Sequence, residues 1–149
     1  MLRFDPNTLK FIDVFIDDTG GVGHLNRPEG LVFDPNGKKL YITSFCDLAS
    51  ECPKASNRDS IRVYDATKRN TFLGQINLDQ GSRAFAQALL FGPGGYLFVP
   101  MSNTGEIRKC NVDTSMYTYT TFIAPGALGA PFYLTFGRTD SATLAYPDQ

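Results

Sequence analysis

The sequence predicts an all-β fold of repeated four-stranded antiparallel sheets, the blade architecture of a β-propeller. Three observations predict it: the composition, the turn signals between apolar runs, and a repeat of about 45 residues. The chain of 149 residues contains 12 Phe and seven Tyr but no Trp, together with 14 Gly and nine Pro. This composition favours strands joined by tight turns over helices.

Three apolar segments of similar pattern each run into a turn and predict the first strand of a hairpin. They lie at residues 28–37, 86–95 and 131–140. The second strands of these hairpins are predicted at 40–45, 96–99 and 142–146. Asn36-Gly37 and Gly94-Gly95 provide residues that accept the positive φ angles of tight turns.

A further pair of strands follows each of the first two hairpins, and the first strand of each pair carries charge on a face expected to be exposed. These pairs are 60–65 with 72–78 and 106–111 with 119–123, and the start of the chain repeats the pattern at 2–5 and 11–16. Phe91 and Phe136 lie 45 positions apart, whereas Phe33 and Phe91 lie 58 apart because a polar insert intervenes. Four strands in about 45 residues are typical of a propeller blade.

The whole chain, 1–149, is therefore predicted to be one propeller-type repeat region. It divides into a half blade at 2–16, a blade at 28–78 with a loop insert at 46–59, a blade at 86–124, and a half blade at 131–147. With strands lettered A to D outward from the axis, the order is C-D, A-B-C-D, A-B-C-D, A-B, so the chain starts and ends mid-blade.

About three blades are fewer than the roughly four to eight of a closed propeller. Either the chain is a fragment of a larger propeller, or two copies close a six-bladed ring in which the first two strands of one copy complete the last blade of the other. A third alternative is a compact sandwich within one chain. Because exposed strand edges promote aggregation, the expected partners are a second copy in a homodimer, a larger assembly, or the rest of a propeller.

The formal net charge is −1, and Lys and Arg are scattered singly. The basic surface that nucleic acid or an anionic membrane requires is thus missing, and neither is an expected partner. No apolar stretch approaches the roughly 18 to 20 residues of a membrane span, and no signal-peptide core precedes the patterned sequence. We expect a soluble chain.

Two of the three cysteines, Cys46 and Cys52, lie in one polar loop, while Cys110 falls in a predicted strand. A Cys46–Cys52 disulfide and three reduced thiols are both open, because the redox compartment decides between them. A disulfide would favour an extracellular location, and the sequence does not otherwise indicate a compartment. A zinc site is not expected, because four ligands are needed and His24 is the only histidine.

The segments 25–37, 40–43 and 60–65 resemble NHL-type repeats and the wider six-bladed gluconolactonase/regucalcin-like propellers. The resemblance covers nearly the whole chain and is strongest in the first full blade. Later repeats depart from it: Gln87 stands at the position of Glu29, and the third hairpin lacks an Asp-Gly or Asn-Gly turn. The resemblance implies the fold more than any one activity.

In the gluconolactonase-like enzymes a divalent metal such as calcium sits at one mouth of the central channel, and Glu29 matches the position of one carboxylate ligand. The repeat counterparts of Glu29 are Gln87 and Phe132, and Asn103 follows an inner-hairpin strand as a second candidate ligand. Calcium takes about six to eight oxygens, so these residues alone are too few. The alternative for both Glu29 and Asn103 is a solvated turn residue.

Other polar residues suggest structural roles. Asp34 and Asp65 precede turns, where a carboxylate accepts hydrogen bonds from backbone amides two residues on. His24 lies on the predicted rim but has no evident acid partner for catalysis. The loop Gly20-Gly21-Val22-Gly23 precedes no helix and is a weak phosphate-binding signal.

Two functions follow. The first is a non-catalytic binding or scaffold propeller that acts through rim loops and strand-edge self-assembly, with no catalytic residues and no cofactor. The alternative is a metal-dependent lactonase or hydrolase of the gluconolactonase-like type, supported by Glu29 and the family resemblance.

Overall fold

The computed structural model describes residues 1–17, 23–46, 58–78, 83–113 and 117–137. Antiparallel sheets of two, four and four strands make up the fold in these ranges, which contain no α-helix, so the all-β prediction is confirmed. The strands are β1 (Leu2–Phe4), β2 (Phe11–Val14), β3 (Leu31–Phe33), β4 (Lys39–Ser44), β5 (Ser60–Asp65), β6 (Phe72–Asn77), β7 (Leu90–Phe91), β8 (Leu97–Met101), β9 (Glu106–Asn111) and β10 (Thr118–Ile123). A 3-10 turn, η2 (Pro93–Gly95), joins β7 to β8. Across the described ranges, no helix has the length and apolar character needed to cross a membrane.

Both four-stranded sheets are meanders in which neighbouring strands follow one another along the chain, β3-β4-β5-β6 and β7-β8-β9-β10. The first two predicted hairpins are present, with Phe33 opposite Leu40 and Phe91 opposite Leu97. Gly37 has a φ of 66° in the first turn, and Gly94 and Gly95 have φ values of 75° and 73° in the second. These are the left-handed conformations for which glycine is suited.

The inner strands β3 and β7 are shorter than predicted. Residues 28–30 and 86–89 belong to no strand, and the backbone just before each segment turns sharply. Arg27 has a φ of 47° and Phe85 a φ of 50°, and the two residues occupy the same position of the repeat, 58 residues apart. A strand cannot run through a left-handed residue, so the extended pairing starts only beyond these positions.

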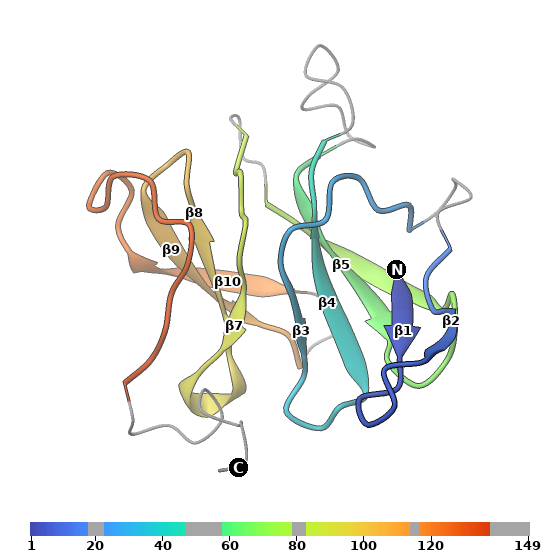
Figure 1. Ribbon diagram of the computed structural model, residues 1–149. Helices are drawn as coiled ribbons and strands as arrows, with labels where there is room; N and C mark the ends of the chain where they lie inside the picture. The colour runs from blue at the N-terminus through green and yellow to red at the C-terminus, as the bar shows by residue number, and fades with distance from the viewer. Residues whose placement is uncertain (18–22, 47–57, 79–82, 114–116, 138–149) are drawn as a thin grey trace.

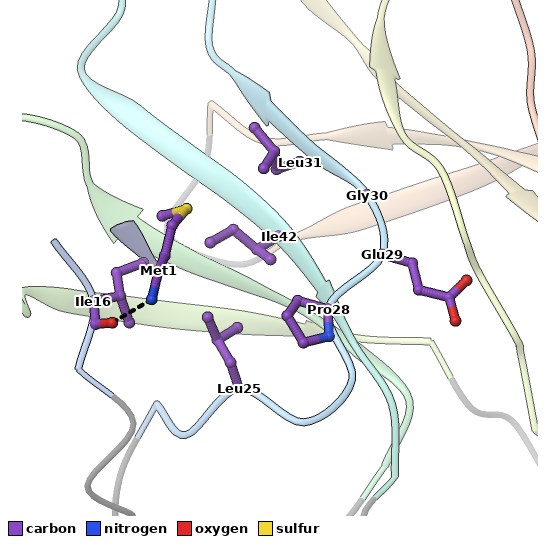
Figure 2. Close-up of a pocket in the computed structure, with 8 residues that line it drawn as sticks. All are labelled: Met1, Ile16, Leu25, Pro28, Glu29, Gly30, Leu31 and Ile42. Atoms are coloured by element: carbon purple, nitrogen blue, oxygen red, sulfur yellow. Dashed lines mark hydrogen bonds between the residues drawn. The ribbon is translucent and has the colours of Figure 1, made fainter. Parts of the chain in front are cut away.

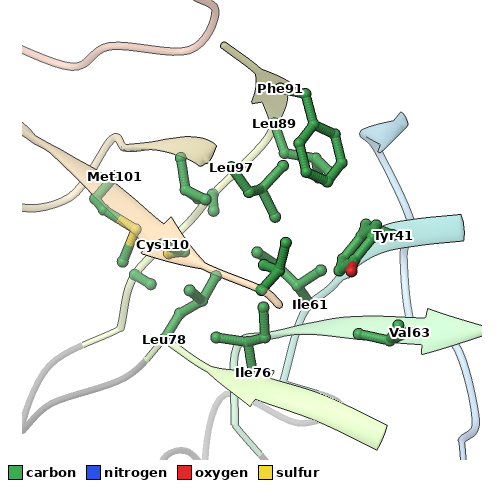
Figure 3. Close-up of a cluster of buried hydrophobic side chains, with 14 residues drawn as sticks. Tyr41, Ile61, Val63, Ile76, Leu78, Leu89, Phe91, Leu97, Met101 and Cys110 are labelled. Carbon is green, nitrogen blue, oxygen red and sulfur yellow. The ribbon is translucent and has the colours of Figure 1, made fainter. Parts of the chain in front are cut away.

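The main core lies between the two four-stranded sheets, which pack face to face (Figure 3). Alternation along the strands directs one set of apolar side chains of the first sheet toward the second. From the first sheet come Tyr41, Ile61, Val63 and Ile76, and from the second come Phe91, Leu97, Val99, Met101 and Cys110. The Tyr41 and Phe91 rings meet edge to face with their centroids 5.4 Å apart.

The opposite face of the first sheet packs against the β1-β2 hairpin. Leu40, Ile42 and Tyr64 are buried there with Phe15 and Ile16. The hairpin is also tied to the β5-β6 turn, because Arg69 Nε donates to the Val14 carbonyl at 3.0 Å and Asn70 N donates to Phe15 O at 3.0 Å. The three sheets thus form a stack in the order β1-β2, β3-β6, β7-β10 (Figure 1).

The C-terminal part of the described chain covers the far face of the second four-stranded sheet. The Phe136 ring packs against Phe98, with centroids 4.8 Å apart and planes at 72°. Residues 131–137 form no strand, in contrast to the prediction for 131–140, because a strand needs a hydrogen-bonded neighbour and none pairs with them among the described residues. Their predicted partner at 142–146 lies outside the described residues.

Candidate functional site at the loop end of the stack

The described ends of the β4-β5 and β6-β7 connections and the β8-β9 connection lie at one end of the stacked sheets, at the top of Figure 1. The short turns β3-β4 and β7-β8 lie at the other end. Loops held by a rigid sheet scaffold are common positions for binding residues. We therefore call the first of these two ends the loop end and examine how its described residues are held.

Asp59, just before β5, is the centre of a buried hydrogen-bond network at the loop end. Its side chain is 1% exposed. One carboxylate oxygen accepts from Arg83 Nη2 at 2.7 Å and from Cys46 N at 2.8 Å. The other accepts from the backbone amides of Ala84 at 3.1 Å and Phe85 at 3.0 Å. Asp59 thereby fastens the end of β4, the start of β5 and the β6-β7 connection to one another.

The same contacts determine the ionisation of Asp59. Burial opposes the charged form, but the hydrogen bonds from Arg83 and from the Phe85 and Cys46 amides outweigh it and hold the pKa of the carboxyl below its ordinary value. Asp59 is therefore an ionised, fully engaged carboxylate at neutral pH. This arrangement suits a structural anchor, since a general base needs a lone pair available to its substrate.

Two arginines and two aromatic rings stack beside this network. Arg83 lies 4.3 Å from the Phe85 ring centroid, the Phe85 and Phe45 rings are 6.1 Å apart, and Arg27 lies 5.7 Å from the Phe45 ring. We call Arg27, Phe45, Arg83 and Phe85 the arginine–phenylalanine cluster. Arg27 is exposed, and it makes no ion pair with the described part of the chain. Its guanidinium combines hydrogen-bond donors with a face suited to cation–π contact.

Glu29 is exposed and precedes β3. Its backbone N–H and that of Gly30 both donate to Thr43 Oγ1, at 3.2 and 2.8 Å. Figure 2 shows its carboxylate pointing away from the apolar side chains around it. The neighbouring Gly30 lies against the segment that leads into β7, since a Cβ there would sit 2.6 Å from the Gln87 carbonyl oxygen. The backbones beside Glu29 and its repeat counterpart Gln87 are thus in contact.

Asn103 is exposed in the β8-β9 connection and acts as a link between loops. Its Nδ2 donates to Arg83 O at 2.8 Å, and its backbone N donates to Ala84 O at 3.4 Å. No contact joins Asn103 to Glu29, and the described residues contain no group of three or more His, Cys, Asp or Glu side chains placed to hold a metal. The metal-ligand role of Glu29 and Asn103 stays a prediction.

Cys46 is disulfide-bonded, but its predicted partner Cys52 lies outside the described residues, so the pairing stays a prediction. Cys110 is a buried free thiol. Burial raises the pKa of Cys110 to about 12, which keeps the thiol protonated and unreactive at neutral pH.

Two turn carboxylates are placed differently from each other. Asp65 accepts from the Thr67 amide two residues on, at 2.8 Å, as predicted. The Asp34 carboxylate instead accepts from the backbone amides of Lys38 and Lys39, four and five residues on, at 2.6 and 2.9 Å.

His24 is half-buried in the β2-β3 connection, and residues 20–22 of the glycine-rich loop lie outside the described residues.

The charges at the start of β9 do not lie on an exposed face, contrary to the prediction from the sequence. The Glu106 and Arg108 residues are only 4% and 5% exposed. Arg108 donates to Glu106 Oε1 at 2.9 and 2.7 Å and to the Leu78 carbonyl at 2.6 Å. Burial is possible because each charge faces its partner, and alternation alone could not indicate that pairing.

Asp59 and the arginine–phenylalanine cluster were also not identified from the sequence. Asp59 stood at the edge of a polar insert, and its partners come from segments up to 26 residues away. The one available signal was the repeat itself, since it aligns Arg27 with Phe85.

The sequence matches no protein family model, and a search of curated proteins found no match.

Proposed function

We propose that the chain is a non-catalytic binding module of the β-propeller type, in which the stacked sheets are successive blades and the loop end binds a protein or peptide partner. The sheet order supports the blade assignment, because two meanders of four strands pack face to face and a two-stranded sheet packs on the first. The contact between Gly30 and Gln87 supports it further, because inner strands of successive blades converge at a propeller axis.

The observation that carries the binding proposal is the Asp59 network. Four hydrogen bonds to one buried carboxylate fix three chain segments before any ligand arrives, so the partner does not need to order them. Phe45, Arg83 and Phe85 lie in or next to these segments, and the exposed Arg27 of the β2-β3 connection lies 5.7 Å from the Phe45 ring, which is itself only 5% exposed. Arginine and aromatic side chains are the residue types that most often dominate the energy of protein interfaces.

A peptide-display selection on the immobilised 149-residue chain tests this proposal. We expect the enriched peptides to lose at least about tenfold in affinity for the Arg27→Ala variant, because one hot-spot side chain contributes more than about 1.4 kcal/mol. Leu73→Ala is the matched control, since Leu73 is 48% exposed on the outer strand β6, away from the cluster. Peptides that lose affinity for the Leu73 variant and keep it for the Arg27 variant would contradict a loop-end site.

Metal-dependent lactone hydrolysis is the competing function, and Glu29 tests it. We expect millimolar Ca²⁺ to leave the melting temperature unchanged in both wild type and Glu29→Gln, because one exposed carboxylate offers at most two of about six to eight oxygen ligands. Differential scanning calorimetry with and without Ca²⁺ measures this, alongside a lactone hydrolysis assay. A Ca²⁺-dependent shift and lactonase activity, both lost in Glu29→Gln, would favour the enzyme.

A further inference from the structure

The first four-stranded sheet leaves part of one face uncovered. Leu31 and Phe33 on β3 are 55% and 52% exposed, although the residues opposite them on β4, Ile42 and Leu40, are each 1% exposed. Directly opposed residues of antiparallel strands share a face. The β1-β2 hairpin therefore covers the outer strands of this face and stops short of the inner strand.

A pocket marks the uncovered part. Its volume is about 260 Å³, and it lies between the N-terminal segments and the inner strand (Figure 2). Its lining is almost entirely apolar: Met1, Ile16, Leu25, Pro28, Glu29, Gly30, Leu31 and Ile42. Figure 2 shows Met1, Ile16 and Leu25 on one side of Ile42 and Leu31, while Glu29 points away. The pocket and the exposed Leu31 and Phe33 together form one apolar surface, which we call the inner face.

We propose that the inner face docks the hairpin at residues 131–146 of a second copy of this chain. The hairpin would pair with the edge of β1 that β2 leaves open and would cover Leu31 and Phe33, so the two-stranded sheet would become four-stranded. This inference rests on the proposed propeller arrangement of the sheets.

The repeat identifies this occupant. Residues 131–146 correspond to the inner hairpins formed by β3-β4 and β7-β8, whereas β1-β2 correspond to the outer pairs β5-β6 and β9-β10. The β1-β2 sheet thus lacks the kind of hairpin that the sequence of 131–146 predicts.

The side-chain pattern of 131–137 fits the same interface. Phe136 packs onto Phe98 of its own chain. In the docked, extended segment, residues at odd separations would point to opposite faces, so Tyr133 would point away from Phe98. Tyr133 is 78% exposed, and its equivalent in the first sheet is Gly30, on the face that contacts the next sheet. Tyr133 is therefore the expected contact for Leu31 and Phe33 of the other copy.

The segment belongs to a second copy because it cannot reach the inner face of its own chain in this arrangement. Residues 131–137 lie on the outer side of the β7-β10 sheet and the β1-β2 hairpin lies on the outer side of the β3-β6 sheet, so both four-stranded sheets separate them (Figure 1). In two copies related by a two-fold axis, the inner face of each copy would be covered by the 131–146 segment of the other.

Sedimentation velocity over a concentration series on the 149-residue chain tests the proposal. We expect a dimer of twice the 16.4 kDa chain mass, and at least about tenfold weaker dimerisation for Leu31→Asp and for Tyr133→Asp. Leu73→Asp is the matched control, an equally exposed leucine of the same sheet that lies outside the inner face, and it should dimerise as wild type does. Circular dichroism melting of each variant shows that it is folded.

Mixing the two variants provides the sharper result. Leu31→Asp keeps the 131–146 segment intact and Tyr133→Asp keeps the inner face intact, so the mixture should form a heterodimer through one intact joint and associate more tightly than either variant alone. A monomeric wild type, an open-ended series of oligomers, or a dimer insensitive to both variants would overturn the proposal. Because peptide binding is measured with the Arg27→Ala variant and dimerisation with the Leu31→Asp and Tyr133→Asp variants, failure of dimerisation and failure of the binding function give different results.

Discussion

Replacing Asp59 with Ala is expected to lower the free energy of unfolding by about 3–5 kcal/mol, the usual cost of removing one partner of a buried ion pair. The variant would leave the half-buried Arg83 without its carboxylate and would leave the amides of Cys46, Ala84 and Phe85 without this acceptor. Asp34→Ala is the matched control, because Asp34 accepts two backbone hydrogen bonds in an exposed turn, and about 1 kcal/mol is expected there. Urea denaturation measures both, and equal losses would contradict the central role of Asp59.

The same carboxylate predicts a dependence on pH. Its pKa is lower in the folded state, so its contribution to stability is present above the unfolded-state pKa, about 3.9, and is lost as the pH falls through the folded-state pKa. Wild type should therefore lose stability below about pH 4 more steeply than Asp59→Ala.

Gly30→Ala is expected to cost about 1–3 kcal/mol, the typical cost of overpacking a close contact. The added methyl group would lie 2.6 Å from the Gln87 carbonyl oxygen and 3.0 Å from the Ala88 Cα, and both are backbone atoms that cannot rotate away. The inner segments of the two sheets would have to separate.

Gly129→Ala is the matched control, because a Cβ at Gly129 meets nothing within 4 Å and its backbone needs no left-handed conformation. We expect it to be neutral within about 0.5 kcal/mol. If Gly30→Ala unfolds at the same urea concentration as Gly129→Ala, the two inner segments are not in contact, and the support that they give to a propeller axis is lost.

The sequence was sufficient to predict the all-β class and the hairpins with Asn36-Gly37 and Gly94-Gly95 turns, because those signals are local. It also aligned Glu29 with Gln87, and the backbone of Gly30, which follows Glu29, lies against that of Gln87. It overestimated the length of the inner strands, since the apolar pattern does not indicate the left-handed conformations of Arg27 and Phe85.

The buried ion pairs of Asp59 and Arg108 could not be predicted from the sequence either. From the sequence, Asp59 is indistinguishable from a loop carboxylate, because its partner Arg83 lies in the β6-β7 connection. Arg108 likewise resembles a surface charge, although it is buried beside Glu106. Pairing between buried charges depends on tertiary contacts that hydrophobic periodicity does not encode.

Small-angle X-ray scattering from the 149-residue chain, recorded as it elutes from a size-exclusion column, tests the propeller account most directly. Two copies that close one ring should form a particle of twice 16.4 kDa whose pair-distance distribution is that of a compact disc with a central channel. A particle of 16.4 kDa, or an elongated dimer without a closed outline, would contradict it.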